Sequence, residues 1–192
     1  MAQPNETFDS YDSKGIREDL QDKIYMVSPE ATPVLSAIRR FKASQKPHEW
    51  QRDSLAAPNK DNAVIEGDDR SGTALTATTR VANTTQLFDK IAVVSSTTEK
   101  SKAAGRSSEM KYQIAKAMKE LKRDLEAMIV SNNPAVAGNS TTARKAAGLG
   151  PLLFTNTSHG TGGSTASHTS GLATAAPTAG TARAFAEAQL KT

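Results

Sequence analysis

Apolar residues recur at every third or fourth position between residues 107 and 132. This spacing places them on one face of an α-helix, while charged side chains occupy most of the other positions. Ser107 or Ser108 can cap the N-terminus, and Pro134 ends the pattern because proline cannot continue the hydrogen-bond ladder. We predict a helix over residues 107–132, roughly 39 Å long. Its packing face consists of Met110, Ile114, Met118, Leu121, Leu125, Met128 and Ile129.

The first 46 residues combine a polar leader with two short helical patterns. The apolar positions are Ile16, Leu20 and Ile24 in the first pattern and Val34, Ile38 and Phe41 in the second. Thr32-Pro33 predicts the start of the second helix, because threonine caps helices and proline favours the first helical position. Two such short helices make a poor independent domain, so we expect residues 1–46 to form an arm that docks elsewhere.

Residues 47–90 favour β-structure but contain few apolar side chains. One strand is predicted around Trp50, its main anchor, and another within the threonine-rich segment 73–85. Turn-forming residues dominate 57–62 and 66–72 between them. The pattern predicts an extended β-hairpin that would be marginal alone in water and that lies across a partner.

The segments that flank the long helix differ from it in composition. Residues 91–94, Ile-Ala-Val-Val, predict a short strand buried on both faces. Residues 146–182 carry no charge and consist mostly of Gly, Ser, Thr and Ala, so 155–180 is predicted to be a flexible loop. A last helical pattern runs from Thr181 to Leu190, and its place at the end of the sequence suggests a partial chain.

The composition limits the size of the core. Hydrophobic residues make up 37% of the 192 residues and aromatic residues 5%, which is low for a self-sufficient globule. We therefore expect extended segments to be buried against other subunits. The absence of cysteine excludes disulfides and thiol chemistry. The sequence has no apolar run of transmembrane length and no signal-peptide pattern, which predicts a soluble protein made in a cytoplasm, without a membrane partner.

The net charge of +4 is unevenly distributed. Residues 1–30 hold three basic and seven acidic side chains, whereas residues 91–192 hold twelve basic and six acidic ones. An acidic front and a basic rear suit head-to-tail contact between copies. A general nucleic-acid binder would instead concentrate Lys, Arg and exposed aromatic residues in one cluster, and the sequence has no such cluster.

Few residues suggest chemistry at a site. His159 and His168 have no carboxylate nearby in the sequence, and we interpret them, like His48, as solvated rather than metal-binding. The acidic turn around Glu66, Asp68 and Asp69 does not fit a calcium-binding loop. We predict no catalytic residue, no cofactor and no metal ion.

Several stretches resemble, in the right order, the major head proteins of tailed bacteriophages of the group typified by phage SU10. These stretches are GIREDLQDKIYMVSPEATPVLSAI (15–38), HEWQRDSLAAPNKDNAVIEGDD (48–69), RVANTTQLF (80–88), AGRSSEMKYQIAKAMKELKRDLEAMIVSN (104–132) and ARKAAGL (143–149). The resemblance covers about residues 5–154 and again 181–192. Members of this group are similar to the HK97 capsid fold.

The resemblance implies an α+β, HK97-like capsid fold. Residues 1–46 would be the N-terminal arm, and residues 47–90 the extended loop (E-loop) that lies over an adjacent subunit. Residues 91–142 would form the peripheral domain with helix 107–132 as its spine, and residues 143–192, with the flexible loop 155–180, would begin the axial domain. Because family chains are considerably longer, this chain looks like the N-terminal part of one.

The function implied by the resemblance is structural, not enzymatic. The chain would self-assemble, as hexamers and pentamers, into the icosahedral head shell around double-stranded DNA. Its implied partners are its own copies, portal and scaffold or decoration proteins, and packaged DNA through non-specific contacts. Its implied location is the virion, after assembly in the host cytoplasm. The alternatives are a basic DNA-binding accessory protein and a metal-dependent enzyme that uses His159 and His168.

Side chains of residues 47–90 have no local core to pack against, which predicts that they contact a neighbouring subunit. The predicted contact residues are Trp50, Arg52, Lys60, Asp68, Asp69 and Arg70. Lys119, Lys122 and Arg123 of the long helix are predicted to face a neighbour's acidic arm or DNA. The capsids of one relative crosslink a loop lysine to an asparagine, and Lys60 lies in a turn that suits such a lysine.

Overall fold

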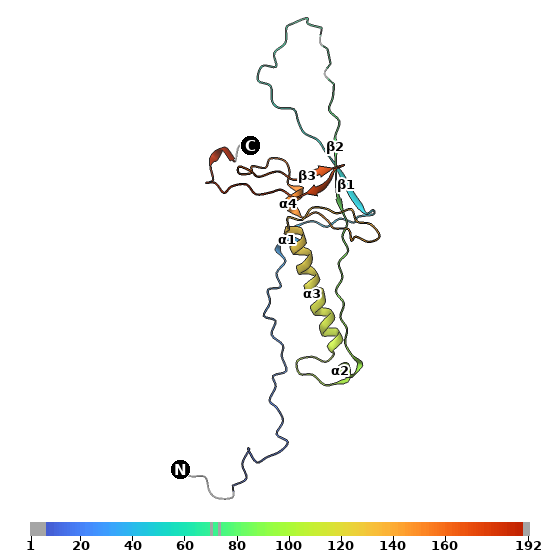
Figure 1. The fold of residues 1–192 in the computed structure, drawn as a ribbon, viewed down its shortest axis with the longest axis vertical. Helices are drawn as coiled ribbons and strands as arrows, with labels where there is room; N and C mark the ends of the chain where they lie inside the picture. The colour runs from blue at the N-terminus through green and yellow to red at the C-terminus, as the bar shows by residue number, and fades with distance from the viewer. Residues whose placement is uncertain (1–6, 70, 73, 190–192) are drawn as a thin grey trace. The chain divides into compact units, whose positions relative to one another are not determined.

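The structure, a computed structural model, describes residues 7–69, 71–72 and 74–189 and mixes helices with strands (Figure 1). The chain divides into two compact units. One consists of Met1–Pro29 and Ile91–Lys119, and the other of Glu30–Lys90 and Glu120–Thr192. Each unit therefore joins segments that are far apart in the sequence.

Helix α3 (Glu109–Val130) confirms the predicted long helix to within two residues at each end. Ser108 is its N-cap, since the Ser108 hydroxyl accepts a hydrogen bond from the Lys111 N–H at 3.2 Å. At the other end, the Ser131 hydroxyl donates to the Met128 carbonyl at 2.7 Å, before Pro134 prevents continuation. No residue of α3 is buried within this single chain.

A four-stranded sheet organises the second unit, with the order β1-β2-β4-β3. Strands β1 (Pro47–Arg52) and β2 (Thr79–Thr84) pair antiparallel, from Pro47 opposite Thr84 to Arg52 opposite Thr79. This pairing confirms the predicted hairpin and leaves residues 53–78 as a long connecting loop. Strand β4 (Leu172–Ala175) pairs parallel to β2 and antiparallel to β3 (Ser167–Thr169).

The core of this unit is small. Ala135, Ala147 and Ala173 are buried together, with Leu152 and Leu172 packed partly against them. Leu152 ends the short helix α4 (Leu149–Leu152). Each alanine removes only one methyl group from water, so this cluster contributes far less apolar burial than leucine or phenylalanine side chains would.

Polar bonds supplement the small core beside β2. The Asn83 side chain donates to the Ala147 carbonyl at 3.2 Å and accepts from the Ala147 N–H at 2.9 Å. The Gln86 side chain accepts from the Ala146 N–H at 3.1 Å. These bonds fix residues 145–147 against the strand and satisfy backbone groups that the sheet itself leaves unpaired.

Helix α1 (Pro33–Ala37) begins where Thr32-Pro33 predicts. Its cap, however, is a carboxylate from α3: the two Glu126 oxygens accept the N–H groups of Val34 and Leu35 at 2.9 and 2.7 Å. Leu35 is the buried residue of this helix. The predicted face of Val34, Ile38 and Phe41 is wrong, because the helix ends at Ala37 and leaves both Ile38 and Phe41 exposed.

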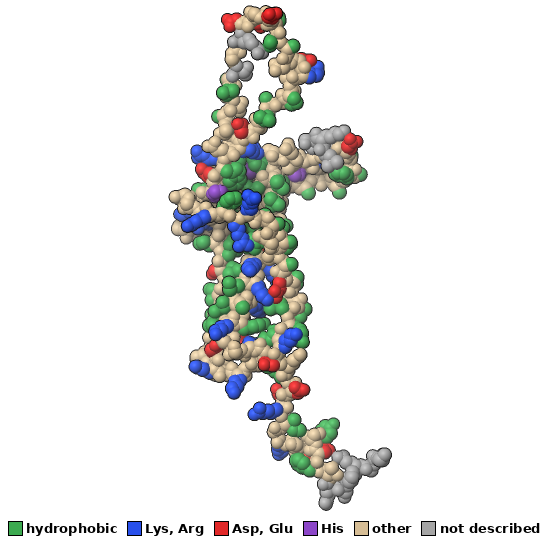
Figure 2. Space-filling model, turned by 180° about the vertical axis from the view of Figure 1, so that it is seen from behind, with side chains coloured by type: hydrophobic (Ala, Val, Ile, Leu, Met, Phe, Trp, Pro, Cys, Tyr) green, Lys and Arg blue, Asp and Glu red, His purple; other side chains and the backbone are tan. Residues whose placement is uncertain are grey.

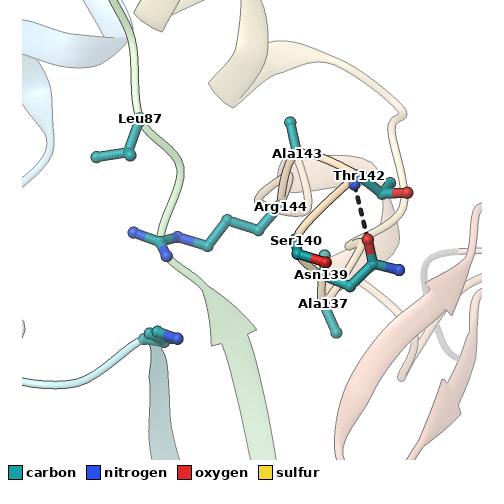
Figure 3. A pocket seen from close by; sticks show the side chains of 9 residues that line it. Leu87, Ala137, Asn139, Ser140, Thr142, Ala143 and Arg144 are labelled. Atoms are coloured by element: carbon teal, nitrogen blue, oxygen red, sulfur yellow. Dashed lines mark hydrogen bonds between the residues drawn. The ribbon is translucent and has the colours of Figure 1, made fainter.

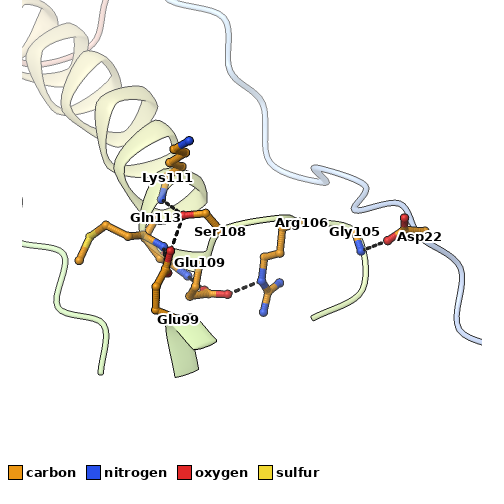
Figure 4. A network of polar contacts seen from close by, with 9 residues as sticks. Asp22, Glu99, Gly105, Arg106, Ser108, Glu109, Lys111 and Gln113 are labelled. Carbon is orange, nitrogen blue, oxygen red and sulfur yellow. Dashed lines mark hydrogen bonds and ion pairs between the residues drawn. The ribbon is translucent and has the colours of Figure 1, made fainter. Parts of the chain in front are cut away.

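The predicted helix at Ile16–Ile24 is also wrong, because residues 15–21 and 23–27 form no regular structure and their side chains are exposed. A pattern of nine residues cannot form a stable helix without a surface to pack on. The segment is held instead by local contacts within the first unit. The Asp22 carboxylate accepts the Gly105 N–H, and the Ile24 side chain lies against Gly105 (Figure 4).

Three further expectations need correction. Residues 91–94 form no strand, and Ile91 is 83% exposed, since nothing in the described part of the sheet pairs with this segment. Residues 155–180, predicted to be a flexible loop, contain β3 and β4. The predicted last helix is reduced to the single turn η1 (Glu187–Gln189), and Leu190 lies outside the described residues.

Candidate inter-subunit surfaces

Trp50 lies in the middle of β1, opposite Val81 of β2. Val81 is buried, whereas Trp50 is 40% exposed, and its ring lies 6.1 Å from that of His48. Trp50 is therefore not the buried anchor of its own strand that the sequence suggested. A large half-exposed aromatic ring on a hairpin is instead typical of a contact residue.

The loop 53–78 exposes large apolar side chains at Leu55, Val64, Ile65 and Leu75, and Leu55 is 99% exposed. Hydrophobic groups of the chain are also visible at the surface in the space-filling view (Figure 2). Isolated surface leucines need no explanation, but four large apolar side chains along one loop form an unusual concentration of exposed apolar surface.

The charged residues of the same loop differ in their partners. Lys60 forms an ion pair with the adjacent Asp61 at 2.7 Å, and both are exposed. Asp68 and Asp69 are exposed, and within the described residues they form no ion pair. Arg70, the remaining predicted contact residue, lies outside the described residues.

Arg52, at the end of β1, lies over the ring of Phe154 at 4.4 Å. The other partner of Phe154 is His168 of β3, with 3.8 Å between the ring centroids. Burial lowers the pKa of His168, and the nearby charge of Arg52 lowers it further. This stack holds the base of the loop to β3 through a neutral imidazole, so Arg52 already has a partner in its own chain.

A polar network surrounds the N-terminus of α3 (Figure 4). Glu99, from helix α2 (Ser96–Lys100), accepts the Ser108 hydroxyl at 2.7 Å and the Met110 N–H at 2.9 Å. These two hydrogen bonds, the Ser108 bond first, lower the pKa of Glu99. Arg106 forms an ion pair with Glu109 in the first turn of the helix. The acidic groups thus complement the positive end of the helix dipole.

The charged face of α3 is only partly paired. Asp124 binds Lys90 at 2.9 Å, and this contact raises the pKa of Lys90. Lys122 and Arg123 are exposed, as the prediction of an external contact requires. Of the predicted packing face, Ile114 and Met118 are also exposed, so their burial needs a partner.

A cavity of about 460 Å³ lies next to the end of β2, between residues 85–87 and the loop 137–144 (Figure 3). Arg144 enters it with its Nε donating to the Thr85 carbonyl at 2.8 Å. Lys46 adds a second cation to the lining. The sequence analysis missed this site, and no local signal reveals it, because Lys46 and Arg144 are almost a hundred residues apart in the chain.

Two structural features are absent from the described residues. They contain no group of three or more His, Cys, Asp or Glu side chains that could hold a metal ion. His168 lies on the ring of Phe154 rather than in a ligand set. Among the described helices, none is both long and apolar enough to cross a membrane.

An alanine core combined with large exposed apolar side chains is typical of a subunit of a larger assembly. Comparison with known proteins gives the class, which is that of bacteriophage major capsid proteins. The chain belongs to the SU10 major capsid protein family, whose model matches residues 3–192. It is also similar to the "Major capsid protein" of Escherichia phage Phieco32, with 35% identity over 131 residues. The match covers 68% of this chain but 37% of that relative, so the chain spans little more than a third of its length.

Proposed function

We propose that this chain is the arm, loop and spine-helix part of a subunit that self-assembles into the icosahedral head shell of a tailed phage around double-stranded DNA. The family match and the mixed α+β structure support an HK97-like fold. In this proposal residues 1–46 are the N-terminal arm, 47–90 the E-loop, 91–142 the peripheral domain with α3 as its spine, and 143–192 the start of the axial domain.

The observation that carries the proposal is the exposure of the loop 53–78. Leu55 and Leu75 are almost fully exposed, while the core cluster nearby consists of alanines. Burying two leucine side chains would contribute about 3–6 kcal/mol per subunit, which the single chain does not obtain. Contact with a second copy would supply this burial, and a shell repeats such a contact in every subunit.

The other contacts proposed for the assembly follow from exposure in the same way. Trp50 and the charges Lys60, Asp68 and Asp69 would contact a neighbouring copy, and Ile114 and Met118 would complete the packing face of α3. The exposed Lys122 and Arg123 would face a neighbour's acidic arm or packaged DNA. Portal, scaffold or decoration proteins would complete the particle, which would assemble in the host cytoplasm.

Electron microscopy of the full reading frame, expressed alone or with its neighbouring phage genes, tests this proposal. We expect closed shells from the native sequence and their loss in the double variant Leu55→Ser/Leu75→Ser. Ala57→Ser is the matched control, because it introduces the same hydroxyl into the same loop without removing a large apolar group. A monomer that binds DNA with a steep salt dependence and never forms shells would instead support the accessory-protein alternative.

A further inference from the structure

The cavity beside β2 presents hydrogen-bond donors and cations. The Arg144 Nε is bound to Thr85, which fixes the guanidinium and leaves its two terminal nitrogens for another ligand. The side-chain oxygen Oδ1 of Asn139 already accepts the N–H groups of Thr141 and Thr142 (Figure 3). The side-chain amide nitrogen of Asn139 is therefore the group that can donate to a ligand. Lys46 makes no ion pair with a described residue.

No acidic residue lines this cavity. Lys46 and Arg144 line the same cavity without a carboxylate between them, so their positive charges repel each other. An anionic ligand would relieve that repulsion. The volume of about 460 Å³ suits several side chains rather than a single ion. The lining also includes Leu87, which is 80% exposed, so the expected ligand combines negative charge with an apolar part.

One segment of the chain has that composition. The turn at residues 64–69 reads Val-Ile-Glu-Gly-Asp-Asp, and its apolar and acidic side chains are all exposed. Within the described residues, Glu66, Asp68 and Asp69 form no ion pair. A Cβ built on Gly67 meets nothing within 4 Å, so the turn stands in open space. The loop holds eleven residues before this turn (53–63) and nine after it (70–78). The shorter side can therefore extend roughly 30 Å.

We propose that this cavity binds the acidic turn of a second copy of the chain, with Glu66, Asp68 and Asp69 against Lys46 and Arg144 and with Ile65 against Leu87. The assignment rests on the proposed function, since it needs copies in contact. Nucleic-acid phosphate fits the cations equally well but offers no apolar side chain to Leu87, whereas the turn supplies both parts.

The lack of cysteine in this sequence permits a direct test by crosslinking. Cysteines are introduced at Asp69 and Ser140, two exposed residues whose side chains form no hydrogen bond with a described residue. In the full reading frame, mild oxidation of assembled particles should then give covalent dimers and larger multimers on a non-reducing gel. The two single-cysteine variants and the pair Asp61→Cys/Ser140→Cys are the controls, and they should give none. Particles that form but yield no multimers from the Asp69/Ser140 pair would overturn this assignment and leave the proposed function intact.

A charge exchange provides the second test. Asp68→Lys/Asp69→Lys reverses the charge of the turn. Lys46→Glu/Thr142→Glu reverses the charge of the cavity while keeping the hydrogen bond between Arg144 and Thr85. Each double variant should lower the yield of particles about tenfold, the effect of one good charge contact, and their combination should restore it. If the turn variant assembles normally and the cavity variant only packages less DNA, the ligand is nucleic acid and the proposal is wrong. If the native sequence forms no particles at all, the proposed function itself fails.

Discussion

Single carboxylates bind backbone N–H groups at the starts of α1 and α3 and at Gly105. Glu126 caps α1, Glu99 caps the start of α3 together with Ser108, and Asp22 binds the Gly105 backbone. Each accepts backbone N–H groups that would otherwise have no partner, and charged acceptors make such bonds stronger than neutral ones. In a protein with so little apolar core, these polar contacts carry an unusual share of the local stability.

Replacement of Glu126 tests how much its carboxylate cap stabilises α1. Glu126→Ala removes both acceptors for the Val34 and Leu35 N–H groups, so we expect the free energy of local opening of α1 to fall by about 1–2 kcal/mol. Glu126→Gln should lose roughly half of that amount, because its amide group retains one acceptor. Hydrogen exchange of the amides at residues 34–38 measures the effect. Arg123→Ala, on the exposed face of the same helix, is the control, and equal protection in all variants would refute the cap.

The lowered pKa of Glu99 predicts a pH-dependent helix end. A carboxyl group whose pKa is lower in the folded state stabilises that state above its ordinary value of 4.5, and this contribution is lost as the pH falls through the folded pKa. Glu99→Gln should therefore melt at a lower temperature than the native sequence at pH 7. The difference should disappear well below pH 4.5, as followed by circular dichroism of α3. Glu18→Gln, an exposed carboxyl in the same unit, should show no such difference at either pH.

At the scale of elements, the joint between the hairpin and β3 depends on a stack of three side chains. The Phe154 ring contacts both the Arg52 guanidinium and the His168 imidazole, and burial of that imidazole lowers the pKa of His168. Protonation would place a second positive charge near Arg52 and would require a hydrated ring. The stack is therefore suited to a neutral histidine.

We expect the contact between the hairpin and β3 to become less stable in mild acid. Because the pKa of His168 is lower in the folded state, the unfolded chain binds the proton first, and the stabilisation declines as the pH falls below the ordinary value of 6.5. After correction for intrinsic rates, amides of β3 and β4 should exchange faster at pH 5.5 than at pH 7.5. His168→Gln should remove this pH dependence, and His48→Gln, which alters an exposed histidine, should not. A pH dependence that persists in His168→Gln would assign the effect to another group.

The elements differ in how well the sequence predicts them, and length explains much of the difference. The pattern from Met110 to Ile129 repeats over many turns, so α3 was predicted with both ends. The pattern from Ile16 to Ile24 is just as regular but short, and no packing surface in the described chain supports a helix there. The strand propensity of residues 91–94 failed for the same reason, since strands need neighbours that local sequence does not specify.

The residues of the candidate site also differ in how well the sequence predicts them. The exposure of the hairpin segment 47–90, including Trp50, Asp68 and Asp69, could be predicted, because turn residues and missing apolar positions are local properties. The cavity around Lys46 and Arg144 could not, because it exists only after β2 and the loop 137–144 come together. The engagement of Arg52 by Phe154 was missed for the same reason.

At the scale of the whole molecule, most of the buried apolar side chains in the described residues are alanines, beside Leu35, Val81 and Pro151. Ala173 is fully buried, while Leu55, Leu75, Ile91 and Phe41 are almost entirely exposed. The described chain thus has defined secondary structure and many specific polar bonds but little apolar area removed from water. Since apolar burial is the main favourable contribution to folding, the contacts proposed between copies would add the burial that this part of the subunit does not obtain by itself.

Calorimetry can measure how little apolar burial stabilises the unassembled chain. A cooperatively folded globule of 192 residues would absorb about 130 kcal/mol near 60 °C. We expect the unassembled chain to absorb less than half of this amount over a broad transition, because the hydrophobic cluster of its second unit consists mainly of alanines. Assembled shells of the full reading frame should instead give a sharp transition at higher temperature. Leu55→Ser/Leu75→Ser, which should form no shells, should lack this sharp transition and leave the broad transition of the unassembled chain unchanged. A sharp, full-sized transition of the isolated chain would mean that its own core suffices and that the exposed loop has no stabilising contact to gain.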